Sequence, residues 1–228
     1  KKLEIAGPGF LNFTLESASL GEVVRTIIKE ANKYGHTNTL QGQNINVEFI
    51  SANPTGPLHL GHTRWAAVGD AIARVLAASG AKVVREFYVN DRGSQLDKFG
   101  ASICAAANNE AVPEDGYHGA YVKELATEII KEKPQILKLS KSEQVIEFRE
   151  EGYKKQLKQQ QNVLDDFRTH FDTWTSERSL HSSGAVEKGL AVLKKHGHVF
   201  ELEGATWLRT TDFGDDKDRV LIKADGEF

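Results

Sequence analysis

The chain has 228 residues, of which 39% are hydrophobic and 27% are charged. This length and composition can build a hydrophobic core, which excludes a disordered chain and allows one large domain or two small ones. The 29 Lys and Arg residues nearly balance the 32 Asp and Glu residues, and the net charge of −3 excludes a global basic field for nucleic acid.

The cysteine content and the hydropathy bear on location. Cys104 is the single cysteine, which excludes a disulfide framework and a Cys-based zinc site. No signal peptide is present, and no apolar run approaches the roughly 18 residues that span a bilayer. We therefore expect a cytoplasmic protein without membrane contact. The sequence begins at Lys1 and stops at Phe228 in a segment that is still extended, so we interpret it as a fragment.

The first 35 residues predict two short strands and a helix. Residues 3–15 are apolar on both sides of Gly7-Pro8-Gly9, which is typical of two extended pieces joined by a turn. Apolar residues then recur at helical spacing over residues 21–34, and Gly35 ends the pattern.

Residues 45–89 predict a strand, a loop, a helix and a second strand. The run 45–50 alternates β-branched and aromatic residues with polar ones, and Glu48 faces away from Val47 and Phe49. A helix is expected from about residue 60 to 79, before Gly80, and a strand at 82–89; a crossover of this kind makes a parallel sheet. The helix carries one face of larger side chains: Trp65, Val68, Ile72, Val75, Leu76 and Ser79.

The remainder of the chain has α+β character. Helical patterns cover residues 91–109, 117–133 and 142–171, with Pro134 ending the second and Gly152 interrupting the third. Extended segments are predicted near 172–178, 198–203, 205–211 and 219–224, with a short helix at about 183–196.

The loop at residues 53–62, with the sequence NPTGPLHLGH, carries the clearest chemical signal. It joins a strand to a helix, so backbone N–H groups and a positive helix end lie at the carboxyl edge of a parallel sheet, where phosphates bind. His59 and His62 share one helical face, and Gly61 leaves room for a flat group to approach. Ordinary capping or surface histidines are the alternative. A metal site would need further ligands, and the sequence has no HExxH pattern.

The tetrapeptide HLGH resembles the HIGH signature of class I aminoacyl-tRNA synthetases and related nucleotidyltransferases, with Leu60 at the tolerant second position. The longer string VEFISANPTGPLHLGH at 47–62 resembles the arginyl-tRNA synthetases. Four further blocks support this resemblance from one end of the chain to the other: EIAGPGFLNF at 4–13, REFYVND at 85–91, SERSLH at 176–181 and TDFGDDKDRVLIKADGE at 211–227. The resemblance implies ATP-dependent ligation of arginine to its tRNA through an arginyl-adenylate, in a class that typically needs tRNA before it activates arginine.

The same resemblance implies an ATP site in the loop. His59 and His62 would hydrogen-bond ATP and stabilise the charge that develops on the α-phosphate as the arginine carboxylate attacks and pyrophosphate leaves. Pro57 and Gly61 would complete the site, with adenine packed against the backbone at Gly61. Mg²⁺ would arrive with ATP, and no metal held by the protein alone is expected.

The resemblance also implies that Glu48, Ser51 and Asn53 face the substrate arginine. A guanidinium group carries a charge and five donors, so its pocket needs a carboxylate and carbonyl-type acceptors. Two alternatives stay open: Glu48 as a solvent-facing strand residue, and Asn53 as a turn former before Pro54. Asn90 and Asp91 end the second strand at the same edge and either line the site or, for Asp91, cap the next helix.

The string Lys138-Leu139-Ser140-Lys141-Ser142 resembles KMSKS, the second signature of the family. It precedes a long charged helix, however, and no second set of strands comes before it. We therefore interpret Ser142 as a helix N-cap with Glu143 in the first turn. The mixed charges of residues 141–168 favour a solvated helical face over an RNA-binding one.

We therefore expect an α/β fold, with a Rossmann-like parallel-sheet nucleotide-binding half-domain and an α+β connective insertion. Residues 1–20 would be the tail of an N-terminal appended domain, 21–110 the first half of the catalytic domain, and 111–228 the insertion. The partners would be arginine and tRNA(Arg), the protein a monomer, and the fragment inactive by itself. Two rival functions are another HIGH-motif nucleotidyltransferase or synthetase, and a non-catalytic module whose loop merely binds a nucleotide or a partner.

Overall fold

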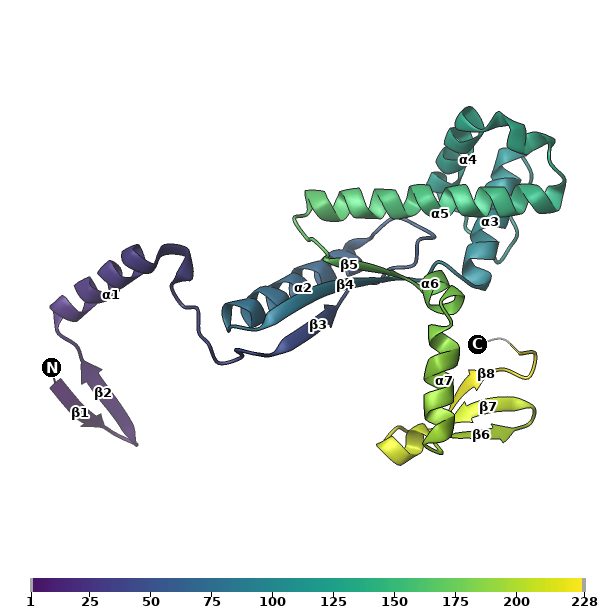
Figure 1. Ribbon diagram of the computed structural model, residues 1–228. Coiled ribbons are helices and arrows are strands. Elements are labelled where there is room, and N and C mark those ends of the chain that lie inside the picture. The colour runs from purple at the N-terminus through teal and green to yellow at the C-terminus, as the bar shows by residue number, and fades with distance from the viewer. Residues whose placement is uncertain (1, 227–228) are drawn as a thin grey trace. The chain divides into compact units, whose positions relative to one another are not determined.

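The computed structural model describes residues 2–226 as a mixture of helices and short strands (Figure 1). In chain order the elements are β1 (Lys2–Ala6), β2 (Phe10–Thr14), α1 (Ser17–Glu30), η1 (Ala31–Lys33), β3 (Asn44–Glu48), α2 (Leu60–Ala78), β4 (Lys82–Val89), α3 (Ser94–Ala107), α4 (Ala120–Glu132), η2 (Pro134–Lys138), α5 (Lys141–Asp166), β5 (Thr173–Ser176), α6 (Glu177–Ser182), α7 (Ala185–Lys195), β6 (Val199–Leu202), β7 (Ala205–Leu208), η3 (Thr210–Phe213) and β8 (Arg219–Ile222). No helix between residues 2 and 226 combines the length and the apolar character that crossing a bilayer requires.

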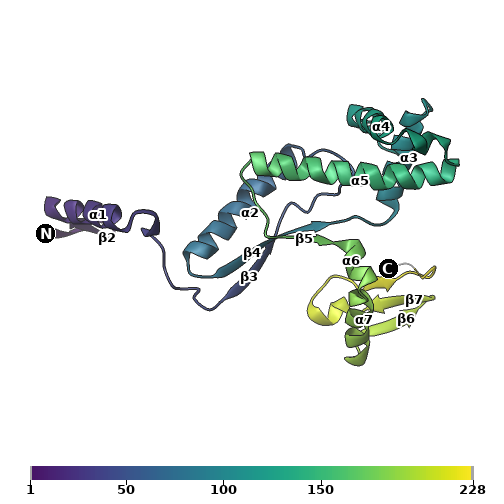
Figure 2. The ribbon, with the colours of Figure 1, turned by 45° about the horizontal axis from the view of Figure 1, so that its top comes forward.

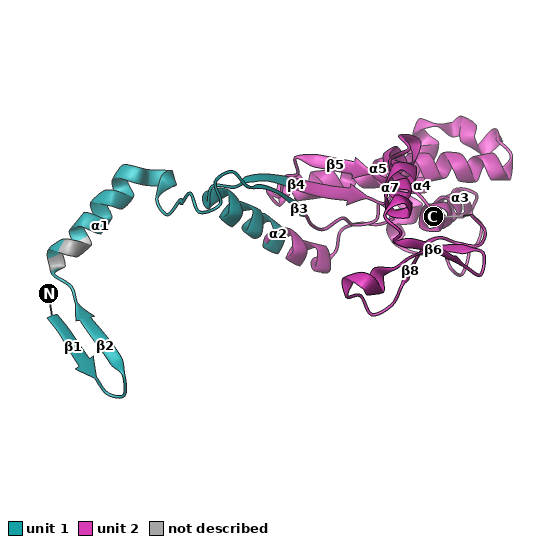
Figure 3. Ribbon diagram, turned by 60° about the horizontal axis from the view of Figure 1, so that its bottom comes forward, with its two compact units in different colours: residues 1–47, 68–84 teal, residues 48–67, 85–228 magenta. Residues whose placement is uncertain are grey.

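The chain divides into two compact units (Figure 3). One unit holds residues 1–47 and 68–84, and the other holds residues 48–67 and 85–228. In the first unit, the two expected strands β1 and β2 pair as an antiparallel hairpin, and α1 follows as predicted. The loop before β3 is tied to the end of α2, where the Thr37 N–H donates to Ala78 O at 2.9 Å.

A three-stranded sheet in the order β3-β4-β5 confirms the expected α/β class. Strands β4 and β5 run parallel, with Glu86 opposite Thr173 and Val89 opposite Ser176. Helix α2 connects β3 to β4, as the strand-loop-helix-strand pattern predicts. The carboxyl ends of the strands therefore lie at one edge of the sheet, and the segments that leave those ends hold the candidate site.

Helix α2 does not bury the face that carries its larger side chains. Trp65 is 64% exposed and Val75 is 65% exposed. The helix instead buries small residues, namely Ala66, Gly69 and Ala73. A row of small side chains lets a helix backbone approach its neighbours closely, so the packed face of α2 is set by size as much as by hydrophobicity.

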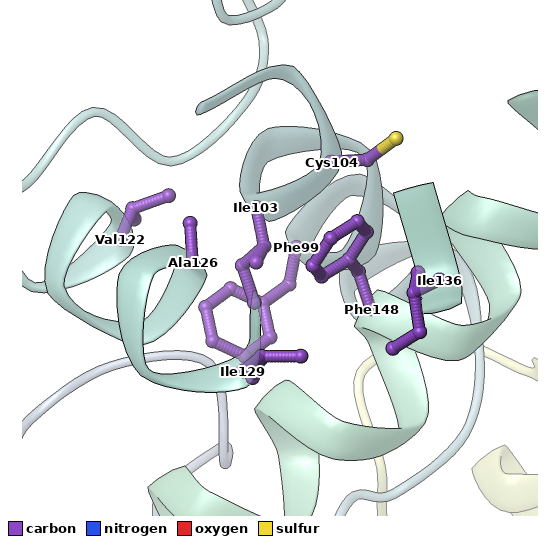
Figure 4. Close-up of a cluster of buried hydrophobic side chains, with 8 residues drawn as sticks. All are labelled: Phe99, Ile103, Cys104, Val122, Ala126, Ile129, Ile136 and Phe148. Carbon is purple, nitrogen blue, oxygen red and sulfur yellow. The ribbon is translucent and has the colours of Figure 1, made fainter. Parts of the chain in front are cut away.

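Helices α3, α4 and α5 pack around a hydrophobic core (Figure 4). Its buried side chains are Phe99, Ile103, Cys104, Val122, Ala126, Ile129, Ile136 and Phe148. Helix α5 has 26 residues and runs on through Gly152, so the predicted interruption there is wrong. A Cβ on Gly152 would lie 2.3 Å from Ile103 Cδ1, which shows that this glycine serves the close approach of α3 and α5.

The C-terminal part is α+β, as expected. Strands β6, β7 and β8 form an antiparallel sheet with α7 beside it (Figure 2). The segment predicted as extended over residues 172–178 is a strand only as far as Ser176. Ser176 then caps the short helix α6 by accepting from the Ser179 N–H at 3.3 Å, so the extended assignment of residues 177–178 is wrong.

Candidate active site

The chain leaves β3 through a tight turn at Ile50 and Ser51, which both have positive φ values of 67° and 41°. The Ser51 N–H donates to Phe49 O at 2.9 Å, which closes the turn. The Ser51 hydroxyl oxygen accepts from the Tyr88 N–H at 3.0 Å, which ties the turn to β4. A β-branched residue in this backbone region costs on the order of 1–3 kcal/mol and persists where the surroundings hold it, often at functional sites.

The rings of His59 and His62 lie against each other at the start of α2, with centroids 3.9 Å apart and planes tilted by 35°. The His59 N–H donates to Nδ1 of His62 at 3.1 Å, and the Gly61 N–H donates to Nδ1 of His59 at 3.1 Å. These two N–H groups belong to the start of the helix, where backbone donors lack an intrahelical partner. The histidines therefore act as caps, and each uses only its Nδ1 atom for this purpose.

The capping bonds fix the protonation of the two rings. A neutral imidazole whose Nδ1 accepts a hydrogen bond carries its proton on Nε2, and that N–H can donate to a ligand. Burial lowers the pKa of His62 below its ordinary value of 6.5, and the neighbouring His59 lowers the pKa further. The pair thus presents Nε2–H donors, and His62 is held in the neutral form at physiological pH.

Gly61 makes room for a neighbouring ring. A Cβ at this position would lie 2.9 Å from Cε1 and 3.0 Å from Nδ1 of His59. The flat group that packs on the Gly61 backbone is therefore the His59 ring itself. A cavity of about 510 Å³ also borders this glycine, lined by Leu60, Gly61, Thr63, Arg64, Ala67 and Phe167. Pro57 lies exposed in the loop before the histidines.

Asn53 belongs to a row of three side-chain amides. Its Oδ1 accepts from Asn90 Nδ2 at 2.6 Å, and its Nδ2 donates to Gln95 Oε1 at 2.6 Å. The row connects the loop after β3 with the segment that leaves β4 and with α3. Asn53 is therefore more than a turn former, because its amide is oriented by partners 37 and 42 residues away.

Three carboxylates act on the Tyr88 hydroxyl near the end of β4. Burial raises the pKa of Tyr88 above its ordinary value of 10.0, and the charges of Glu177, Asp91 and Glu48 raise the pKa further. Glu48 is exposed at the last position of β3. Its negative charge is thus one of three at this edge of the sheet, which is the electrostatic setting that a guanidinium cation needs.

Asp91 is a buried hub of hydrogen bonds that binds a backbone N–H at the start of α6 and does not cap the helix that follows it, α3. Its side chain is 2% exposed and accepts from Ser176 Oγ at 2.6 Å, Tyr153 OH at 3.1 Å and the Arg178 N–H at 3.0 Å. Burial and the charge of Asp91 raise the pKa of Tyr153 to about 12, so the phenol stays a donor. Helix α3 takes Gly93 as its N-cap, and the capping prediction for Asp91 is wrong.

The string that resembles KMSKS has a local structural role. Ser140 is the N-cap of α5 and forms a capping box with Glu143, so the prediction of Ser142 as the cap is wrong by two residues, although Glu143 does lie in the first turn. The Lys141 ammonium pairs with Glu110. Helix α5 rises about 1.5 Å per residue, which puts Lys141 roughly 30 Å along the helix from Gln160, a residue that touches the histidine loop.

The site also contains side chains that the sequence alone did not reveal. Gln95 orients Asn53, Glu177 adds the largest charge effect on Tyr88, and Gln160 binds the loop before the histidines. Glu177 lies in SERSLH, one of the sequence blocks that carry the family resemblance. Gln95 is exposed on α3 and Gln160 is buried on α5, and no local pattern marks either of them.

The comparisons with known proteins agree on one family. Residues 23–228 match the family model described as the catalytic domain of class I tRNA synthetases (R). Arginine–tRNA ligases from Renibacterium salmoninarum and Frankia alni are 54% and 50% identical over 225 residues, and in each case the match covers 99% of this chain and 41% of the relative. A crystal structure from Campylobacter jejuni, assigned as an arginyl-tRNA synthetase, has a TM-score of 0.81 at 32% identity and covers 93% of this chain and 48% of that one.

The chain therefore spans about two fifths of the length of these curated relatives. The match is continuous and includes the histidine loop, the end of β4 and the segment around β5. The chain belongs to the arginyl-tRNA synthetase family of class I synthetases, and residues 23–228 are a segment of that family's catalytic domain.

Proposed function

We propose that the protein to which this chain belongs ligates arginine to tRNA(Arg) and that the loop around His59 and His62 serves the first step. In that step the arginine carboxylate attacks the α-phosphorus of ATP, the bond to the β-phosphate oxygen breaks, and pyrophosphate leaves with the electron pair. The product is an arginyl-adenylate, from which the arginyl group passes to tRNA. Residues 21–110 would form the first half of the catalytic domain.

The histidine pair is the observation that carries this proposal. Both rings use Nδ1 to accept a backbone N–H, which leaves the Nε2–H groups as donors. Phosphoryl transfer needs donors placed where negative charge develops and needs no protein nucleophile. A neutral His62 matches this role, because a donor that already carries its proton does not depend on pH near neutrality. The cavity beside Gly61, with the Arg64 cation in its lining, offers space for the nucleotide.

The edge of the sheet beyond β3 and β4 fits the substrate arginine. Glu48 contributes one of the three negative charges that reach Tyr88, and Asn53 and Ser51 contribute oxygen acceptors held by Asn90 and by the β4 backbone. Oxygen lone pairs and negative charge are what a guanidinium group with five donors requires.

Mg²⁺ is proposed to enter with ATP. Over residues 2–226 no group of three or more His, Cys, Asp and Glu side chains is arranged to hold a metal ion. The Mg²⁺ ion would bind the triphosphate, where it would neutralise phosphate charge.

Exchange between ATP and pyrophosphate in the full-length protein, with tRNA present, tests the substrate directly. We expect exchange with arginine and a rate lower by ~100-fold or more with lysine or citrulline, because a site built for a charged, five-donor group leaves its acceptors unpaired with either. Glu48→Gln should raise the KM for arginine, whereas Glu124→Gln on the exposed face of α4 should not. Equal exchange with another amino acid would show that the protein is a different HIGH-motif enzyme.

A further inference from the structure

Two side chains from helices that come later in the sequence donate hydrogen bonds to the loop between β3 and the histidines. The Tyr121 hydroxyl on α4 donates to Thr55 O at 2.8 Å. The Gln160 amide on α5 donates from its single Nε2 to Asn53 O at 3.0 Å and to Gly56 O at 2.9 Å. Three of the four carbonyl groups of residues 53–56 are thereby bound by side chains that lie 66 to 107 residues further along the chain.

The burial of Gln160 indicates that its two donors are what the position needs. Gln160 is 1% exposed, and its Oε1 is buried without a hydrogen-bond partner among the residues that the structure describes. Turning the amide over would place this oxygen against two carbonyl oxygens, so the orientation is fixed. An unpartnered buried acceptor is unfavourable, and a leucine of similar size would avoid it. The glutamine therefore supplies two N–H donors to the loop, at the cost of one buried oxygen without a hydrogen bond.

Tyr121 is suited to the same task. Burial raises its pKa to about 12, and the nearby Tyr117 contributes, so the phenol keeps its proton and remains a donor. Its ring stacks on Phe99 of the α3–α4–α5 core, with ring centroids 6.3 Å apart.

We propose that Tyr121 and Gln160 are positioning residues, which hold the loop 53–56 so that His59 and His62 stand where the nucleotide is to be bound. The effect on catalysis rests on the proposed function, whereas the three hydrogen bonds to the loop do not depend on it. The helices α3, α4 and α5 share one buried core, so the loop is fastened to a rigid body. The helices α4 and α5 thus hold the histidine loop through its backbone carbonyl groups.

The test compares Gln160→Leu and Tyr121→Phe with two matched controls in the full-length protein. Gln161→Leu makes the same change one residue along α5, and Tyr117→Phe removes the hydroxyl of the other tyrosine that packs on Phe99. Deuterium uptake is measured for the peptide that covers residues 50–62, together with the thermal midpoint and the kcat of arginine-dependent ATP–pyrophosphate exchange.

We expect faster deuterium uptake in the loop for Gln160→Leu and Tyr121→Phe, and kcat lower by ~10-fold and ~3-fold, as the loss of two bonds and one bond would give. The thermal midpoints should stay close to those of the controls, because Gln160→Leu also removes the unpartnered oxygen. Unchanged deuterium uptake in the loop would overturn the proposal, and so would a loss of kcat that the control variants share. If the wild-type protein shows no arginine-dependent exchange, the proposed function fails, and deuterium uptake still decides whether the two side chains hold the loop.

Discussion

Replacing Gly61 by alanine should separate the stability of the protein from its activity. A Cβ at position 61 would lie 2.9 Å from Cε1 of His59, closer than two such atoms approach, and the neighbour that must move is a side-chain ring. The His59 ring can avoid the clash by rotating away from its preferred rotamer, which costs about 0.5–1.5 kcal/mol. The hydrogen bond from the Gly61 N–H to this ring, worth about 1 kcal/mol, is then lost. Alanine in a helix recovers roughly 0.5–1 kcal/mol over glycine. The free energy of unfolding should therefore change by no more than about 1–2 kcal/mol.

The activity of Gly61→Ala should fall much further than its stability. A displaced His59 no longer presents its donor to the reacting phosphate, and removing one such donor lowers kcat by about 10²–10³. The assay is ATP–pyrophosphate exchange with arginine and tRNA in the full-length protein, paired with urea unfolding.

Gly189→Ala is the matched control for this substitution. Gly189 lies within α7, and a Cβ there would meet no atom within 4 Å. This variant should gain the helix propensity, roughly 0.5–1 kcal/mol, and keep full exchange activity. Full activity in Gly61→Ala would refute the conclusion that this glycine seats a catalytic His59.

Three other outcomes follow from the contacts. Asp91→Asn should lower the free energy of unfolding by about 2–4 kcal/mol in urea unfolding at neutral pH, because a buried acceptor of three hydrogen bonds loses its charge. A change below about 1 kcal/mol would contradict a stabilising role for these three hydrogen bonds. Folding lowers the pKa of His62, so the difference in stability between the wild-type protein and His62→Gln should be constant above pH 6.5, the ordinary pKa of histidine, and shrink as the pH falls below it. Thermal melts across this pH range measure the difference, and a difference that grows as the pH falls would contradict the lowered pKa. Gly100→Ala should cost ~1–3 kcal/mol in the same melts, because its Cβ would lie 2.8 Å from Val145 O.

Local patterns in the sequence predicted the elements well. The strand expected at 82–89 has those bounds, and α2 ends one residue before the expected end. Such features depend on side-chain periodicity and on turn residues within a few positions. The sequence does contain the pattern that identifies the true N-cap of α5, because Ser140 with Glu143 three residues later is typical of a capping box.

The contacts that orient the candidate site were beyond local patterns. Asn53 is held by Gln95, and its carbonyl by Gln160, which lies 107 residues away. Asp91 has an ordinary N-cap sequence environment, yet its partners come from α5 and from the β5–α6 connection. Residue type and spacing could indicate that Glu48, Ser51 and Asn53 share a sheet edge, whereas their partners depend on how α3 and α5 pack.

ATP–pyrophosphate exchange by His59→Ala and His62→Ala in the full-length protein tests whether the histidine pair serves the activation of arginine. We expect arginine- and tRNA-dependent exchange in the wild-type protein and a kcat about 10²–10³ lower in each variant, with folding retained. Exchange that proceeds at the wild-type rate in both variants would contradict the catalytic role of the histidines and leave the loop as a binding element without a role in the chemistry.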